Sequence, residues 1–140
     1  MHVATERINV NTRGESDVID ITPELAALIE KIGFKNGIAA VFVPGATGAL
    51  STIEYEPGAV KDLKAAFERI APREGHYAHN TKWGDGNGFS HVRASVMGPS
   101  ITVPVSGGRM TLGTWQQVIF MDFDNRPRSR EIVVQFLGER

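Results

Sequence analysis

The sequence contains no cysteine, which excludes disulfides, thiolate zinc sites and a cysteine nucleophile. No segment approaches the roughly 20 apolar residues that a membrane-spanning helix needs. Residues 2–11 are polar with mixed charge and lack the apolar core of a signal peptide. Neither sign of charge dominates, and a net charge of −1 argues against a broad basic face for nucleic acid. We therefore expect a cytoplasmic protein that binds neither membranes nor nucleic acid.

The residues that are present match an average globular domain, with 41% hydrophobic and 22% charged among 140 residues. Because no linker, repeat or low-complexity stretch interrupts the chain, we expect a single domain over residues 1–140. Strand patterns dominate and the last three suggest an antiparallel meander, so the pattern predicts an α+β fold. The expected strands are residues 3–10, 17–21, 37–44, a strand through Tyr55, 100–105, 115–123 and 130–138.

Two main helices and one short helix complete the expected fold. Thr22 before Pro23 predicts the start of the first helix, with the threonine as cap. Pro57 opens the second helix and Pro72 stops it. The apolar residues at helical spacing are Leu25, Leu28, Ile29 and Ile32, then Val60, Leu63, Phe67 and Ile70, and, in the short helix, Phe89, Val92 and Val96.

The stretch WGDGNGFSHVRAS, residues 83–95, is the strongest candidate for a binding site. Asn87 or Asp85 can cap the short helix, and Gly86 and Gly88 let the backbone approach a ligand closely. His91 lies four residues after Asn87, so both side chains can point to one side of the first turn. Such a turn can hold a phosphate or a carboxylate group. The alternative is a well-capped helix with an exposed histidine.

A divalent metal, zinc or magnesium, is a second possibility for the same region. Imidazole and carboxylate groups are suitable ligands, and His76, His79, Asp85 and His91 supply them. His79, Asp85 and His91 form the narrower candidate set. The spacing matches no standard zinc motif, and the alternative is that these histidines face solvent.

Two further segments offer candidate contacts. The turn PGATGALST, residues 44–52, can cradle an anion through backbone N–H groups beside Thr47. Glu54, on the strand that follows, can act as a base. The segment GTWQQ places Thr114 and Gln116 on one face of a predicted strand. The alternatives are a plain turn and strands with one solvated face.

Arg126, Arg128 and Arg130 form a small basic patch near the end of the chain. Their alternation places them at the start of the last predicted strand. We interpret this patch as the solvated beginning of that strand.

Several segments together resemble the YjbQ-like family, small proteins often labelled secondary thiamine-phosphate synthases. The resemblance covers nearly the whole chain in the expected order. It is carried by IEYEPG (53–58), GDGNGFSHVRAS (84–95), GPSITVPV (98–105), LGTWQQVIFMDFDNRPR (112–128) and VVQFLGE (133–139).

The resemblance implies a strongly bent, half-barrel-like antiparallel sheet, a homotrimer, and weak joining of a pyrimidine pyrophosphate to a thiazole phosphate. It implies a pocket lined by the region of His79, by Asp85, Asn87 and His91, and with Thr114 and Gln116 near it. Asn87, His91 and Arg93 would then neutralise the departing pyrophosphate. The candidate acid–base groups are His79, Asp85, His91 and Glu54, and the candidate ligand contacts are Thr47, Gly86, Asn87, Gly88, Arg93, Thr114 and Gln116.

Two departures from the family pattern favour an anion site over a tight metal site. Many members have His-Thr-Thr where this chain has Gly45-Ala46-Thr47, and close relatives often have histidine at the position of Phe89. Three functions follow as hypotheses: an enzyme acting on phosphorylated small molecules, a non-catalytic metal- or phosphate-binding trimer, and a structural trimer with a degenerate pocket.

Overall fold

A computed structural model describes residues 1–140, which form eight strands and four helices. The strands form a five-stranded sheet in the order β1-β8-β3-β5-β6 and a three-stranded sheet in the order β2-β7-β4, and all pairs are antiparallel. The strands are β1 His2–Thr12, β2 Asp17–Asp20, β3 Asn36–Phe42, β4 Gly48–Ile53, β5 Ser100–Ser106, β6 Arg109–Met110, β7 Gln117–Asp122 and β8 Arg128–Glu139. The helices are α1 Thr22–Ile32, α2 Pro57–Ile70, α3 Ala78–Trp83 and α4 Gly88–Met97.

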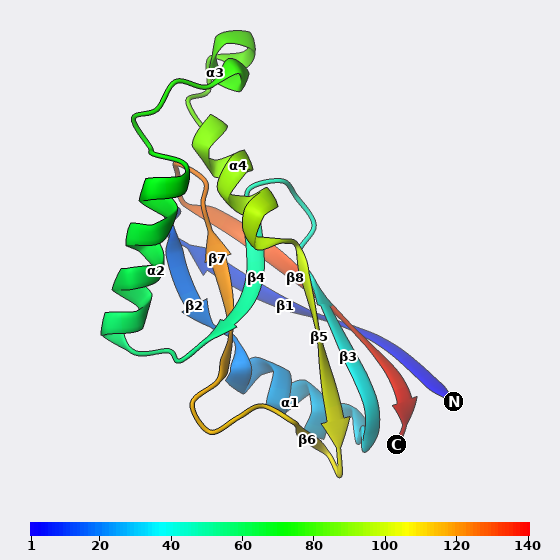
Figure 1. Cartoon of the computed structure of the whole chain (residues 1–140). Helices are drawn as coiled ribbons and strands as arrows, with labels where there is room; N and C mark the ends of the chain where they lie inside the picture. The colour runs from blue at the N-terminus through cyan, green and yellow to red at the C-terminus, as the bar shows by residue number, and fades with distance from the viewer.

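The sheets curl together into a half-barrel, with α1 at the lower end and α2 and α4 along one side (Figure 1). The backbone hydrogen bond from the Leu50 N–H of β4 to the Gly98 carbonyl, just before β5, joins the two sheets. The main core lies between the five-stranded sheet, the inner face of β7 and α1, and includes Phe34, Phe120 and Phe136.

A second core lies on the other face of the three-stranded sheet, under α2 and α4. It contains Phe67, Ala94, Ile119, Met121 and Phe123. The strand β7 therefore contributes Phe120 to one core and Met121 to the other. Burial on both faces explains why its sequence is apolar without alternation.

The predicted α+β fold with a bent antiparallel sheet is confirmed, but three local predictions differ. β5, β7 and β8 do not pair with one another; β8 pairs with β1 and β3, and β7 with β2 and β4. Residues 78–83, which lie outside every predicted helix and strand, form α3. α1 has Ile21 rather than Thr22 as N-cap, because the Thr22 hydroxyl accepts instead from the Val118 N–H (2.8 Å).

The topology brings four segments to the upper end of the molecule in Figure 1. These are the end of β7, the start of β8, the β3–β4 turn, and α3 with the beginning of α4. The Phe123 N–H donates to the Thr47 carbonyl, and the Ser90 hydroxyl donates to the Phe123 carbonyl (2.5 Å). These bonds fix the β3–β4 turn and α4 against the end of β7. None of the four helices combines the length and apolar character needed to cross a bilayer.

Candidate functional site

A cavity of about 450 Å³ opens where these segments meet, and we call it the polar cavity. Only two of its lining residues are hydrophobic. Its lining consists of Gly45, Ala46 and Thr47 from the β3–β4 turn, His79, Trp83, Asp85, Asn87 and His91 from α3, α4 and the loop between them, Asp124 and Arg126 from the β7–β8 connection, and Arg128 and Arg130 from the start of β8.

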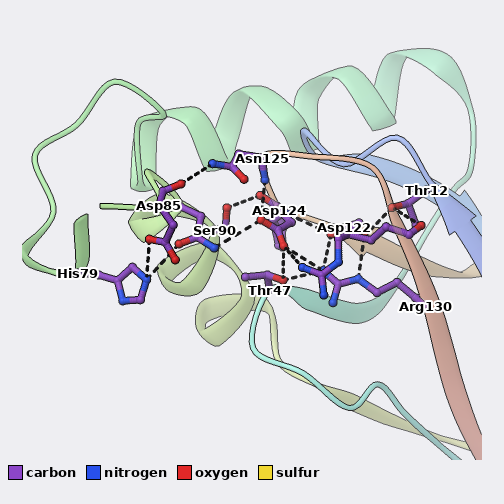
Figure 2. A network of polar contacts seen from close by, with 12 residues as sticks. Thr12, Thr47, His79, Asp85, Ser90, Asp122, Asp124, Asn125 and Arg130 are labelled. Atoms are coloured by element: carbon purple, nitrogen blue, oxygen red, sulfur yellow. Dashed lines mark hydrogen bonds and ion pairs between the residues drawn. The ribbon is translucent and has the colours of Figure 1, made fainter. Parts of the chain in front are cut away.

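Arg130 of the cavity lining forms a buried ion pair with Asp122 (Figure 2). Arg130 donates from Nε and Nη2 to the two Asp122 oxygens, both at 2.9 Å, and from Nη2 to the Thr47 hydroxyl at 2.6 Å. The Thr12 hydroxyl donates to the same carboxylate at 2.6 Å. The hydrogen bonds to Asp122 raise the pKa of Arg130 above its ordinary value, although burial acts in the opposite direction.

Asp124 is the second buried carboxylate of the site. It accepts from Arg128 Nη1 at 2.5 Å, from the Asn125 N–H at 2.8 Å and from the Thr47 hydroxyl at 3.3 Å. Burial alone would raise the pKa of Asp124, but the hydrogen bond from Asn125 and the charge of Arg128 outweigh it, so the pKa lies below its ordinary value. Arg128 and Arg130 are therefore both held by carboxylates, whereas Arg126 makes no ion pair.

Two histidines face each other on the opposite side of the polar cavity. The rings of His79 and His91 lie with centroids 4.4 Å apart and a tilt of 53°. His79 Nε2 lies 3.3 Å from Asp85 Oδ1. This pair from α3 and the following loop thus places an imidazole beside a carboxylate at the cavity.

The Asn87 amide connects these groups. With its nitrogen toward them, it donates to His79 Nε2 at 3.0 Å and to the two Asp85 oxygens at 3.0 and 3.2 Å. The alternative orientation keeps a 3.0 Å contact from His79 Nε2 to Asn87 Oδ1 and a 3.5 Å contact from Nδ2 to Asp124, but it turns Oδ1 toward the acceptor oxygens of Asp85, so we assign the first. The neutral His79 ring then carries its hydrogen on Nδ1, because Nε2 accepts from Asn87.

The predicted side-chain cap of α4 is wrong. Asn87 occupies the N-cap position without a side-chain cap bond, because its amide serves His79 and Asp85. The free Gly88 N–H donates instead to Oδ1 of Asn80, eight residues earlier, at 2.9 Å. A cap supplied from α3 has no signature in the local sequence of α4.

Gly86 and Gly88 do not line the polar cavity, contrary to the prediction that they approach a ligand. Gly86 has a φ of +69°, a left-handed conformation that favours glycine in the turn. A Cβ on Gly88 would lie 2.4 Å from the Cβ of Tyr77. Gly86 therefore serves the turn between α3 and α4, and Gly88 allows the start of α4 to pack closely against Tyr77.

Arg93 also lies outside the polar cavity, and its predicted role as an anion contact is wrong. Its side chain is buried, and the guanidinium donates to the Ala71 carbonyl (2.9 Å), the Ser16 hydroxyl (2.9 Å) and Glu68 (2.6 Å). Phe89 lies beneath this guanidinium, 4.9 Å from ring centroid to Cζ, and is fully buried. Phe89 therefore does not form part of the cavity wall.

Glu54, Thr114 and Gln116 lie at the other end of the sheets. Glu54 follows the far end of β4 and is exposed. Thr114 is in a turn before β7 rather than on a strand. Gln116 lines a separate groove, where it donates to the Thr52 hydroxyl at 3.2 Å. None of the three lines the polar cavity, because the six-residue β7 separates them from Asp124.

The predicted metal site is not formed. No three His, Cys, Asp or Glu side chains gather so that they can hold a metal ion. His76 is exposed and outside the polar cavity. The rings of His79 and His91 contact each other at a tilt of 53°, and the two histidines do not form a ligand set with Asp85.

The arginine patch is the part of the site that our sequence interpretation missed. Arg130 is buried rather than solvated, and all three arginines line the polar cavity. The segment DFDNRPRSR, residues 122–130, carried a usable signal, since Asp122 and Asp124 alternate at one strand end and Arg128 and Arg130 at the next strand start. Residues two apart on a strand share a face, so the acids and bases can meet.

Fold and site together define a small α+β protein with a polar cavity at one end of two curled sheets. The chain belongs to the family described as UPF0047 protein YjbQ-like, whose model matches residues 6–139. A UPF0047 protein of Methanothermobacter thermautotrophicus is 37% identical over 99% of this chain and 95% of its own. UPF0047 protein YugU of Bacillus subtilis is 31% identical over 94% of this chain and 97% of its own.

Solved structures agree with the fold. A YbjQ-like protein of unknown function from Sulfolobus solfataricus has a TM-score of 0.89 at 28% identity and covers 99% of this chain and 100% of its own. A hypothetical protein from Aeropyrum pernix has a TM-score of 0.90 at 32% identity and covers 97% of this chain and 99% of its own.

The expectation of thiamine-phosphate synthase activity is wrong. The curated relatives that match this chain carry only the UPF0047 name, and the Sulfolobus solfataricus protein is described as having unknown function. The resemblance therefore gives the fold and the family, while the function must be argued from the site.

Proposed function

We propose that this protein binds a small molecule bearing a phosphate or similarly compact anionic group in the polar cavity. The observation that carries this proposal is Arg126, which lines the cavity and has no carboxylate partner. The other two arginines of the lining are already neutralised by Asp122 and Asp124. An incoming anion would supply the missing partner of Arg126, and guanidinium is well suited to phosphate oxygens.

The two histidines add proton transfer to this binding site. His79, supported by Asp85 at 3.3 Å, and the adjacent His91 ring face the same cavity as Arg126. A protonated imidazole beside the anion would strengthen its binding and can donate a hydrogen bond to it. His79, Asp85 and His91 are thus the acid–base groups of the site, and Thr47 and Asn87 hold the walls in place.

Titration calorimetry with inorganic phosphate at fixed ionic strength tests the proposal. Arg126→Gln should weaken binding about tenfold, because a hydrogen bond to a charged group contributes roughly 1.5–3 kcal/mol. Arg69→Gln is the matched control, since Arg69 is an exposed arginine on α2 without an ion pair. Absence of phosphate binding to the unsubstituted protein, or equal effects of the two variants, would contradict the proposal.

We also propose that the protein is a cytoplasmic homotrimer. The outer face of the five-stranded sheet supports self-association, because Val3, Ile38 and Leu137 are exposed and lie side by side in the strand register. Light scattering should give about three times the chain mass of 15.3 kDa. Ile38→Glu should reduce that mass, and a monomeric mass for the unsubstituted protein would disprove the trimer.

A further inference from the structure

A second, smaller cavity of about 190 Å³ adjoins the polar cavity, and we call it the small cavity. Gly45, Ala46 and His91 line both cavities. His91 and the Gly45–Ala46 turn therefore form the rim at which the two cavities meet. The small cavity extends from this rim along α4, past Ser95, toward Pro99.

The two cavities differ in chemistry. The polar cavity contains three arginines and two aspartates besides its histidines, whereas the small cavity has no charged side chain and only His91 as a titratable group. An anion in the small cavity would lose water without gaining a cation, which is costly. The charge pattern therefore directs the anionic group of a ligand to the polar cavity and an uncharged part to the small one.

The size and walls of the small cavity fit a ring. An apolar protein cavity of about 150 Å³ accommodates benzene, and the small cavity is somewhat larger at about 190 Å³. Its walls are made of small side chains and a proline, including Ala46, Ala94 and Pro99. Short side chains leave flat surfaces against which a planar group can pack closely.

We propose that the ligand of this protein has two parts, a compact anionic group in the polar cavity and one uncharged ring in the small cavity. His91 lies at the junction, beside the bond that connects the two parts. This inference rests on the proposed function, because binding of the anion near Arg126 fixes the direction in which the ligand lies.

The test compares methyl phosphate and phenyl phosphate, which carry the same anionic group and differ in the ring. Calorimetry on the unsubstituted protein should show phenyl phosphate binding about tenfold more tightly, as expected from burial of one ring. Ser95→Phe fills the small cavity from an exposed position of α4. It should abolish the preference for phenyl phosphate while methyl phosphate binds as before, and Ser95→Ala should keep the preference.

Val96→Phe is the matched control, because Val96 is the next residue on α4, is exposed, and does not line either cavity. It should leave both affinities unchanged. Equal binding of the two esters, or a preference that survives Ser95→Phe, would overturn the two-part ligand and leave the anion site standing. If neither ester binds, the proposed function and this inference both fail.

Discussion

Asp122 and Arg130 form an almost fully buried ion pair, so its two charges depend on each other. Removal of one partner leaves an uncompensated buried charge, which costs more than the net contribution of the pair. Asp122→Asn should lower the free energy of unfolding by about 3–5 kcal/mol in urea denaturation. Glu131→Gln, which breaks the exposed pair with Arg7, should cost about 0.5 kcal/mol. Similar losses in the two variants would contradict this assignment.

Because of Asp124, the free energy of unfolding depends on pH, and the sign of this dependence can be predicted. Its pKa is lowered in the folded protein, so the unfolded chain binds the proton more readily. The stabilisation is therefore complete above the ordinary aspartate pKa of about 3.9 and is lost as the pH falls through the lower folded pKa. Denaturation at pH 7 and near pH 3 should show a smaller acid-induced loss in Asp124→Asn than in the unsubstituted protein.

Asp62→Asn controls for the removal of a carboxylate, because Asp62 is exposed on α2 and makes no ion pair. The Asp62→Asn variant should lose as much stability between pH 7 and pH 3 as the unsubstituted protein does. An identical pH profile for Asp124→Asn would show that Asp124 does not contribute to it.

At the scale of elements, α4 depends on α3 for its first hydrogen bond. Asn80→Ala removes the acceptor of the Gly88 N–H and should cost about 1 kcal/mol in the free energy of unfolding, as loss of an N-cap does. Thr81→Ala is the matched control, because Thr81 is exposed on α3 and has a similar helix propensity to asparagine. Equal stability of both variants would exclude the inter-helix cap.

At the scale of the whole molecule, β7 couples the two cores. Phe120→Ala opens a cavity in the first core and Met121→Ala in the second, with losses of about 3–5 and 2–5 kcal/mol respectively. Because one strand carries both residues, we predict a single unfolding transition that shifts to lower denaturant in each variant. Near- and far-ultraviolet circular dichroism should give coincident curves, and a two-step curve in either variant would show that the cores unfold separately.

The sequence by itself determined the class of fold and most element positions. Proline, glycine and apolar spacing act within a few residues, so α1, α2 and β3 could be located from Pro23, Pro57 and the run after Gly37. The same local signals singled out the segment containing Asp85, Asn87 and His91, which the structure places at the polar cavity. They missed α3, whose short helix has no apolar face.

Tertiary structure alone decided which side chains meet at the polar cavity. The hydrogen bond from Arg130 to Thr47 joins residues 83 positions apart, and the pairing of strands, not any local pattern, brings them together. The same folding buries Arg93 in a structural network and leaves Glu54 and Gln116 at the opposite end of the sheets. Local periodicity specifies the helices and strands. Long-range packing determines which charged side chains are paired, and it leaves the unpaired Arg126 at the cavity.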